Sequence, residues 1–183
     1  KAIFEEYGVE CNATGSRVNV NYRKKLAHDL SVTIKIDGSF KVVDGKITDP
    51  AGNEPIVNNS VDACSIHRNM KQTATGYSFP NANLYFSSPY HTHEFCLLET
   101  GDKYESMRAH MKNVLADINE LIANPVLHNV EVQVKDADGE DKTLMLSTPV
   151  SVCATLDQAA AHELFGQSGC NSSHSCPYCL IPT

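Results

Sequence analysis

The sequence has no long apolar run and no excess of positive charge. No stretch approaches the ~18–20 apolar residues of a transmembrane helix, so a membrane-spanning helix is excluded. Lys and Arg number 15 against 22 Asp and Glu, which gives a formal net charge of −7. Nucleic-acid binding draws most of its affinity from cations on phosphates, so this balance disfavours a simple nucleic-acid-binding domain. If DNA is the substrate, other parts of the protein must supply most of the affinity.

Internal repeats and low-complexity tracts are also missing, and residues 1–5 do not have the character of a signal peptide. The chain of 183 residues is 42% hydrophobic and 20% charged, which is typical of a globular protein. This length suffices for one full core and is too short for two ordinary domains. The sequence therefore predicts one full core.

Cysteine is present in an odd number, seven, and only the last three cysteines cluster. The seven are Cys11, Cys64, Cys96, Cys153, Cys170, Cys176 and Cys179. This distribution favours reduced thiols plus a metal site over a disulfide framework. Three glycosylation-type triplets, at Asn12, Asn58 and Asn171, keep an alternative open. That alternative is an extracellular domain with disulfides and glycans.

Two stretches in the first half of the chain have strand character. Residues 30–37 alternate apolar with polar side chains, which predicts a strand that ends at Asp37 and Gly38. Residues 40–43 predict a second, short strand closed by the turn Asp44-Gly45. The polar stretch 48–80 predicts a long loop or a set of short strands.

The second half has clearer periodicity. Two further strands are predicted around residues 84–86 and 94–98, and residues 102–122 carry one apolar stripe at helical spacing. The valines of 130–134 and the leucines of 144–146 flank an acidic tip, which indicates a hairpin. Residues 150–154 predict a strand that reaches Asp157 and turns into a helix ending near Gly166.

The element Cys176-Pro-Tyr-Cys179 near the end of the chain is a candidate half zinc site. Thiolates at i and i+3 can share one tetrahedral Zn²⁺, and two more ligands must then come from elsewhere. His174 and Cys170 are the nearby substitutes, although one short loop leaves little slack for four bonds. A redox dithiol is the alternative, but the sequence after Cys179 lacks the helix start that lowers a thiol pKa.

The order of these elements predicts a mixed α/β sheet covered by amphipathic helices. We divide the chain into a lead-in segment over 1–27, a core over 28–166, and the start of a zinc-binding insertion over 167–183. Such a sheet brings strand ends together, so Asp37 and Asp157 are candidate neighbours despite their separation in sequence. We expect their carboxylates within about 8 Å of each other, close enough to share a metal pair.

Three features of the sequence resemble the catalytic core of the V(D)J recombinase and its Transib-type transposase relatives. These are the Asp37-Gly38 pair, the segment His93-Glu-Phe-Cys-Leu-Leu98 followed by the amphipathic helix, and Asp157 followed by a helix, Gly166 and Cys176-x-x-Cys179. The resemblance covers roughly residues 28–180. It implies an RNase H-like fold and a nuclear DNA transposase or endonuclease that acts in recombination, forms a homodimer and binds transposon or signal ends.

In that family two aspartates and a distant glutamate bind two Mg²⁺ or Mn²⁺ ions. Carried over by position, the resemblance makes Asp37 and Asp157 the metal ligands, with Asp44 as the substitute for the first, and Cys176 and Cys179 the zinc ligands. The glutamate and the remaining zinc ligands have no counterpart before Thr183, so we expect no Mg²⁺-dependent DNA cleavage by these 183 residues alone. A zinc-binding interaction module that no longer cuts DNA is the alternative function.

Each motif also has an ordinary structural explanation. Asp37-Gly38 is a common turn pair, and Asp157 is a favoured residue type for a helix N-cap. Cys176 and Cys179 could be buried thiols. His91 and His93 lie at a spacing that can hold a metal, but no third ligand is evident, so a surface or hydrogen-bonded pair is favoured.

Overall fold

A computed structural model describes residues 9–11, 17–19, 21–67, 70–82, 92–98, 104–135 and 139–155. Over these residues the protein is mixed α/β, as the sequence predicts. The elements in chain order are β1 (Val9–Cys11), β2 (Arg17–Asn19), α2 (Tyr22–Asp37), β3 (Lys41–Val43), β4 (Lys46–Thr48), β5 (Ile56–His67), β6 (Met70–Ser78), β7 (Thr92–Leu98), α3 (Tyr104–Ala123), β8 (Val126–Lys135), β9 (Asp141–Pro149) and β10 (Ser151–Thr155).

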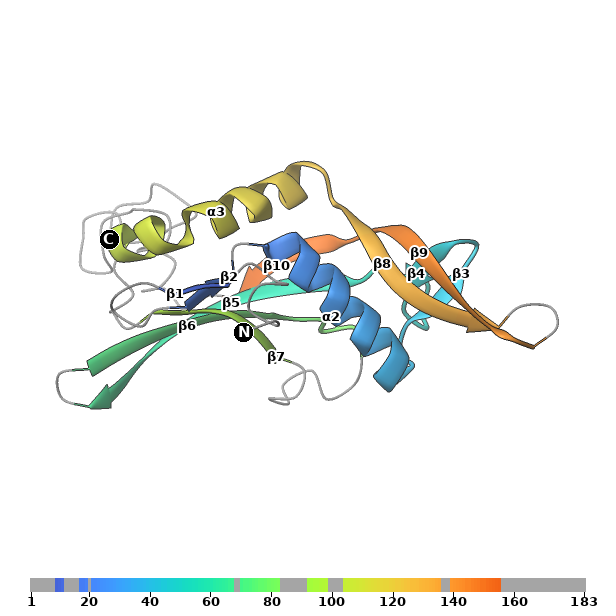
Figure 1. Ribbon diagram of the computed structural model, residues 1–183, viewed down its shortest axis with the longest axis horizontal. Helices are drawn as coiled ribbons and strands as arrows, with labels where there is room; N and C mark the ends of the chain where they lie inside the picture. Colours follow the sequence, from blue (N-terminus) through green and yellow to red (C-terminus); the bar gives the residue numbers. More distant parts are fainter. Residues whose placement is uncertain are drawn as a thin grey trace, which may run out of the picture.

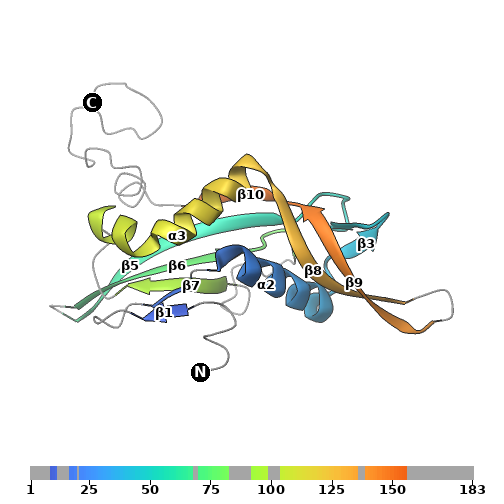
Figure 2. The same cartoon turned by 45° about the horizontal axis from the view of Figure 1, so that its top comes forward.

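The centre of the fold is a six-stranded sheet with the strand order β1-β2-β7-β6-β5-β10. Strands β5, β6 and β7 form an antiparallel meander, whereas β10 pairs parallel to β5. The chain reaches β10 from β7 through helix α3 and the β8–β9 hairpin (Figure 1). This hairpin forms a separate two-stranded sheet that projects beyond the main sheet (Figures 1 and 2).

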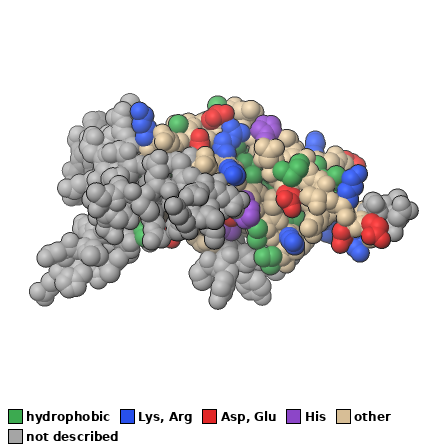
Figure 3. Space-filling model, in the orientation of Figure 1, with side chains coloured by type: hydrophobic (Ala, Val, Ile, Leu, Met, Phe, Trp, Pro, Cys, Tyr) green, Lys and Arg blue, Asp and Glu red, His purple; other side chains and the backbone are tan. Residues whose placement is uncertain are grey.

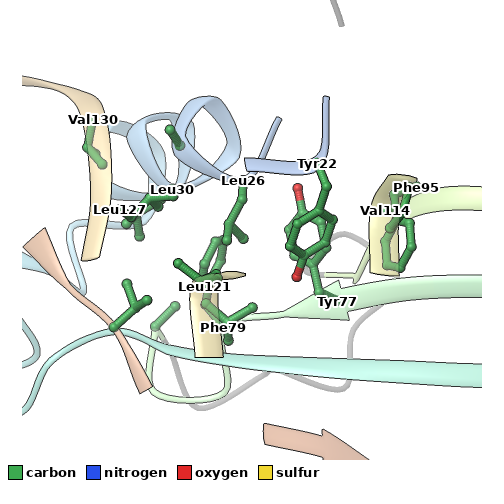
Figure 4. Packing of buried hydrophobic residues seen from close by; sticks show 14 of the residues in the cluster. Tyr22, Leu26, Leu30, Tyr77, Phe79, Phe95, Val114, Leu121, Leu127 and Val130 are labelled. Atoms are coloured by element: carbon green, nitrogen blue, oxygen red, sulfur yellow. The ribbon is translucent and has the colours of Figure 1, made fainter. Parts of the chain in front are cut away.

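Helices α2 and α3 share one core with the sheet (Figure 4). Helix α2 contributes Tyr22, Leu26 and Leu30, and each is fully buried. Ring centroids of Tyr22 and Phe95 of β7 lie 5.2 Å apart in an edge contact, which fixes the start of α2 on the sheet. Burial of each large apolar side chain contributes roughly 1.5–3 kcal/mol, so these residues hold the helix in place.

The strand predicted for residues 30–37 is wrong, because these residues are the second half of helix α2. Leu26 and Leu30 are buried at helical spacing, while Ile36 is 79% exposed, an arrangement that a strand with period two does not give. Gly38 ends the helix in the left-handed conformation (φ 64°) and donates its N–H to the carbonyl of Ile34. Of the apolar residues at 30, 32, 34 and 36, Leu30 and Ile34 are four apart and continue the helical stripe that begins upstream, at Tyr22.

Two alternatives are predicted for residues 48–80, a long loop or a set of short strands, and the structure has strands there that are long. Two long strands, β5 and β6, pair from Asn58 and Ser78 to His67 and Met70. The polar residues at the start of β5 suit a strand here because neighbouring elements hydrogen-bond their side chains. The amide group of Asn59, for example, accepts a hydrogen bond of 2.7 Å from the hydroxyl of Tyr22.

The other elements that the sequence predicts within the described residues are confirmed. Helix α3, the β8–β9 hairpin and strands β7 and β10 lie where the periodicity indicates. Strands β3 and β4 are joined by Asp44 and Gly45, both with positive φ (51° and 75°), which is the two-residue hairpin that Asp-Gly favours. The strand predicted around residues 84–86 and the helix after Asp157 lie outside the described residues.

Candidate functional site

The parallel pair of β5 and β10 is where the fold brings distant parts of the chain together. Ser151 pairs with Ile56 and Thr155 pairs with Ser60, so partners on the two strands are numbered 95 apart. No bulge interrupts the five described pairs. Strand β10 enters this position after a crossover of helix α3 and a hairpin, which is long enough for a parallel connection.

Side chains at this pair separate onto the two faces of the sheet. Asn58 accepts hydrogen bonds at its Oδ1 from the hydroxyl of Thr155 (3.0 Å) and from Sγ of Cys153 (3.4 Å). Asn59, the next residue, instead accepts a bond from Tyr22 on the helix-covered face. The face of Asn58, Cys153 and Thr155 is therefore polar and lies away from α2.

Asp62 is the acidic residue on β5 that sequence reasoning missed. It follows Ser60 by two residues and pairs with Ala74 of β6, well inside the sheet. The stretch Val61-Asp-Ala-Cys64 has one carboxylate among apolar residues, which is the signal that could have identified it. That signal is weak in the sequence, because the polar stretch 48–80 predicts either a long loop or a set of short strands.

The structure separates the other two candidates for the first carboxylate from this sheet. Asp37 is the last residue of helix α2, so it does not end a strand. Asp44 is exposed in the turn between β3 and β4, which form a sheet of their own. In Figures 1 and 2, α2 runs away from the arrowhead end of β10. Neither Asp37 nor Asp44 therefore lies at the end of a strand of the six-stranded sheet, which was the reason to expect a metal ligand there.

The other predicted metal ligands lie outside the described part of the chain. These are Asp157 for Mg²⁺ and, for zinc, Cys170, His174, Cys176 and Cys179. Among the residues that the structure describes, no three His, Cys, Asp or Glu side chains gather as a metal site. Cys96 and Cys153 are free thiols, and burial raises the pKa of Cys96 to about 11.

A second polar cluster joins α2 to the sheet around the carboxylate of Asp29. Its Oδ2 accepts a hydrogen bond of 2.6 Å from the hydroxyl of Tyr77 and forms an ion pair with Lys25. Nδ1 of His93 lies 3.2 Å from the same oxygen. The rings of Tyr77 and His93 stack with centroids 5.3 Å apart, which aligns both donors on one acceptor.

Electrostatics explain why this carboxylate stays ionised. Burial alone raises the pKa of Asp29, but hydrogen bonds from His93, Lys25 and Tyr77 outweigh it and lower the pKa to about 2. The other side chains of the cluster are mostly buried, with 19% of Lys25 and of His93 exposed. His93 is thus the hydrogen-bonded histidine favoured from the sequence, and the cluster orients α2 on the sheet.

Comparison of the sequence with protein-family models and with curated proteins finds no match. In the described part of the chain, neither helix is long and apolar enough to cross a membrane. The fold and the β5–β10 pair are therefore the basis for assigning a function.

Proposed function

We propose that the chain is part of an RNase H-like DNA transposase or recombinase that cleaves and joins phosphodiester bonds with two metal ions. The observation that carries the proposal is the parallel addition of β10 beside the first strand of the β5–β6–β7 meander. The order expected of an RNase H-like fold is an antiparallel meander, then a crossover helix, then a strand parallel to the first strand of the meander and next to it. The β8–β9 hairpin would then be an insertion in the crossover.

The proposal replaces Asp37 with Asp62 as the first metal ligand. Asp62 and Asp157 are numbered 95 apart, the same offset that relates every described pair of β5 and β10. Asp62 also lies four residues after Asn58, and Asp157 two after Thr155. Because residues an even number apart share a face of a strand, we expect both carboxylates on the polar face, beside each other.

Two such carboxylates suit the chemistry. In-line displacement at phosphorus is assisted by two divalent cations ~4 Å apart, one activating the attacking hydroxyl and one stabilising the leaving oxygen. Carboxylate oxygens are the ligands that Mg²⁺ prefers. Asp62 and Asp157 would hold the pair from adjacent strands, and a glutamate outside these 183 residues would complete the site. Zinc at Cys176 and Cys179 would organise the following insertion.

Metal titration of the purified chain tests the aspartate pair. Mn²⁺ is paramagnetic, so its binding can be followed by electron paramagnetic resonance. We expect the wild-type chain to bind Mn²⁺, and Asp62→Asn and Asp157→Asn each to weaken binding at least about tenfold, the equivalent of one lost charged ligand. Asp37→Asn and Asp44→Asn are matched controls that also remove one negative charge and should bind as the wild type does.

Equal loss in all four variants would indicate diffuse attraction to an acidic protein and would refute the site. Loss in Asp37→Asn but not in Asp62→Asn would restore the first carboxylate to Asp37. Zinc binding without any Mn²⁺ binding would instead favour the interaction module that no longer cuts DNA.

A further inference from the structure

A groove runs between helix α2 and the β8–β9 hairpin, away from the β5–β10 pair. Its volume is about 1050 Å³, and residues of α2 line one wall and residues of β8 the other. The space is at the upper limit of the ~300–1,000 Å³ of small-molecule pockets, so it suits an extended ligand better than a small one. We call it the α2–β8 groove.

Hydrogen bonds hold the two walls of this groove together. Arg23 at the start of α2 forms an ion pair of 2.7 Å with Glu120 of α3 and donates a bond of 2.9 Å to the carbonyl of Val126. Farther along, the backbone N–H of Glu131 in β8 donates a bond of 2.9 Å to the hydroxyl of Ser31. The groove therefore has a fixed width at two points and is a built feature of the fold.

Cations outnumber anions in the lining of the groove, whereas anions outnumber cations in the whole chain. The charged side chains of the lining are the cations Arg23, Lys24, Lys35 and Lys135 and the anions Glu120, Glu131 and Asp141. Two histidines, His28 and His128, join them. The whole chain has 15 cations against 22 anions, so cations are concentrated here. Figure 3 shows Lys, Arg and His side chains, interspersed with Asp, Glu and hydrophobic ones, over the region where α2 and β8 run side by side.

An irregularity in β8 presents polar groups to the groove. The register with β9 shifts between Leu127 and Val130, and Asn129 has a left-handed φ of 60°. His128 and Asn129 are consequently exposed at the groove. Nδ1 of His128 lies 2.8 Å from the hydroxyl of Ser147, a contact that restrains the ring. Bulges and left-handed residues of this kind often occur at binding sites.

We propose that the α2–β8 groove binds the phosphate backbone of DNA at a distance from the reacting bond. This inference rests on the proposed function and names a second contact for the same substrate. Lys35 and Lys135 would contact phosphates at one end of the groove and Lys24 at the other, with His128 and Asn129 between them. Such contacts would hold DNA without reading its sequence.

The test is DNA binding by the full 183-residue chain in EDTA, which excludes any contribution from divalent metals. Fluorescence anisotropy of a labelled duplex is measured at salt concentrations from roughly 50 to 200 mM. The test variant is Lys35→Glu with Lys135→Glu, and the matched control is Lys41→Glu with Lys46→Glu. All four lysines are exposed, and the two double variants change the net charge equally.

We expect the groove variant to weaken binding and to lower the slope of log affinity against log salt by about two, one for each lost phosphate contact. The control should keep the wild-type slope. Equal losses in the two double variants, or no measurable binding by the wild type, would overturn the proposal. A polyglutamate peptide that binds as tightly as DNA would also overturn the proposal. If the chain binds DNA as expected but binds no Mn²⁺, the proposed metal site is refuted and the proposal for the α2–β8 groove stands.

Discussion

The hydroxyl of Tyr77 donates a hydrogen bond of 2.6 Å to Oδ2 of Asp29 and so joins strand β6 to helix α2. The two residues are 48 positions apart in the sequence. Lys25 and His93 contact the same oxygen, and 13% of the Asp29 side chain is exposed. The position of α2 on the sheet therefore depends on a carboxylate that is mostly removed from water and has three partners on one oxygen.

Replacing Asp29 with Asn should destabilise the protein by about 2–4 kcal/mol, because it leaves the mostly buried ammonium of Lys25 without its counter-ion. Urea unfolding followed by circular dichroism measures the change. Asp44→Asn is the control, since Asp44 is exposed in a turn that asparagine also favours. We expect a change within about 0.5 kcal/mol there. A similar small effect in Asp29→Asn would show that the cluster contributes little.

The same carboxylate should make stability depend on pH. The pKa of Asp29 is lowered from 3.8 to about 2 in the folded protein, so its contribution is full above pH 3.8 and is lost as the pH falls through 2. The shift corresponds to about 2 kcal/mol. Urea unfolding between pH 2 and pH 6 gives the free energy of unfolding of the wild type and of Asp29→Asn. The difference between the two free energies should be constant above about pH 4 and should become smaller below it. A difference that persists unchanged at pH 2 would contradict the role of the ionised carboxylate.

The sequence allowed the second half of the fold to be predicted better than the first. Helix α3 and the β8–β9 hairpin have one buried and one wet face, so each carries a single clear period. Helix α2 has β-branched residues in its second half and half-buried neighbours on both sides of its buried stripe. The alternation from Leu30 to Ile36 therefore resembles that of a strand. In the helix, however, Leu30 lies on the same buried stripe as Leu26, one turn earlier.

The sequence alone does not single out Asp62, the proposed first metal ligand, for a related reason. Strand β5 begins with polar residues that find partners in tertiary contacts, such as Asn59 with Tyr22 and Asn58 with Thr155. Composition alone indicates a loop for such a stretch, and Asp62 within it then has no special position. The parallel register with β10, which depends on the folded sheet, is what relates Asp62 to Asp157 by number.

Alanine substitutions at Leu30 and Ile36 distinguish the helix from the strand that the alternation suggested. In a strand both side chains would share the buried face, whereas in α2 Leu30 is fully buried and Ile36 is 79% exposed. We expect Leu30→Ala to cost about 2–5 kcal/mol and Ile36→Ala to change stability within about 0.5 kcal/mol. Urea unfolding of both variants measures this difference. Comparable losses at the two positions would mean that residues 30–37 are not arranged as a helix.

Zinc content tests the pair Cys176 and Cys179, whose thiolates have the spacing of half a tetrahedral site. We expect the purified chain to retain zinc after dialysis, Cys176→Ser to lose it, and Cys153→Ser to keep it, because Cys153 is an exposed free thiol on β10. Atomic emission gives the zinc content, and titration with a thiol reagent under denaturing conditions gives the number of reduced cysteines. Bound zinc requires ionised thiolates, so a zinc-loaded chain must titrate with at least Cys176 and Cys179 reduced. Fewer thiols and no zinc would instead support the disulfide-bonded extracellular domain and would remove the basis for a zinc-binding insertion.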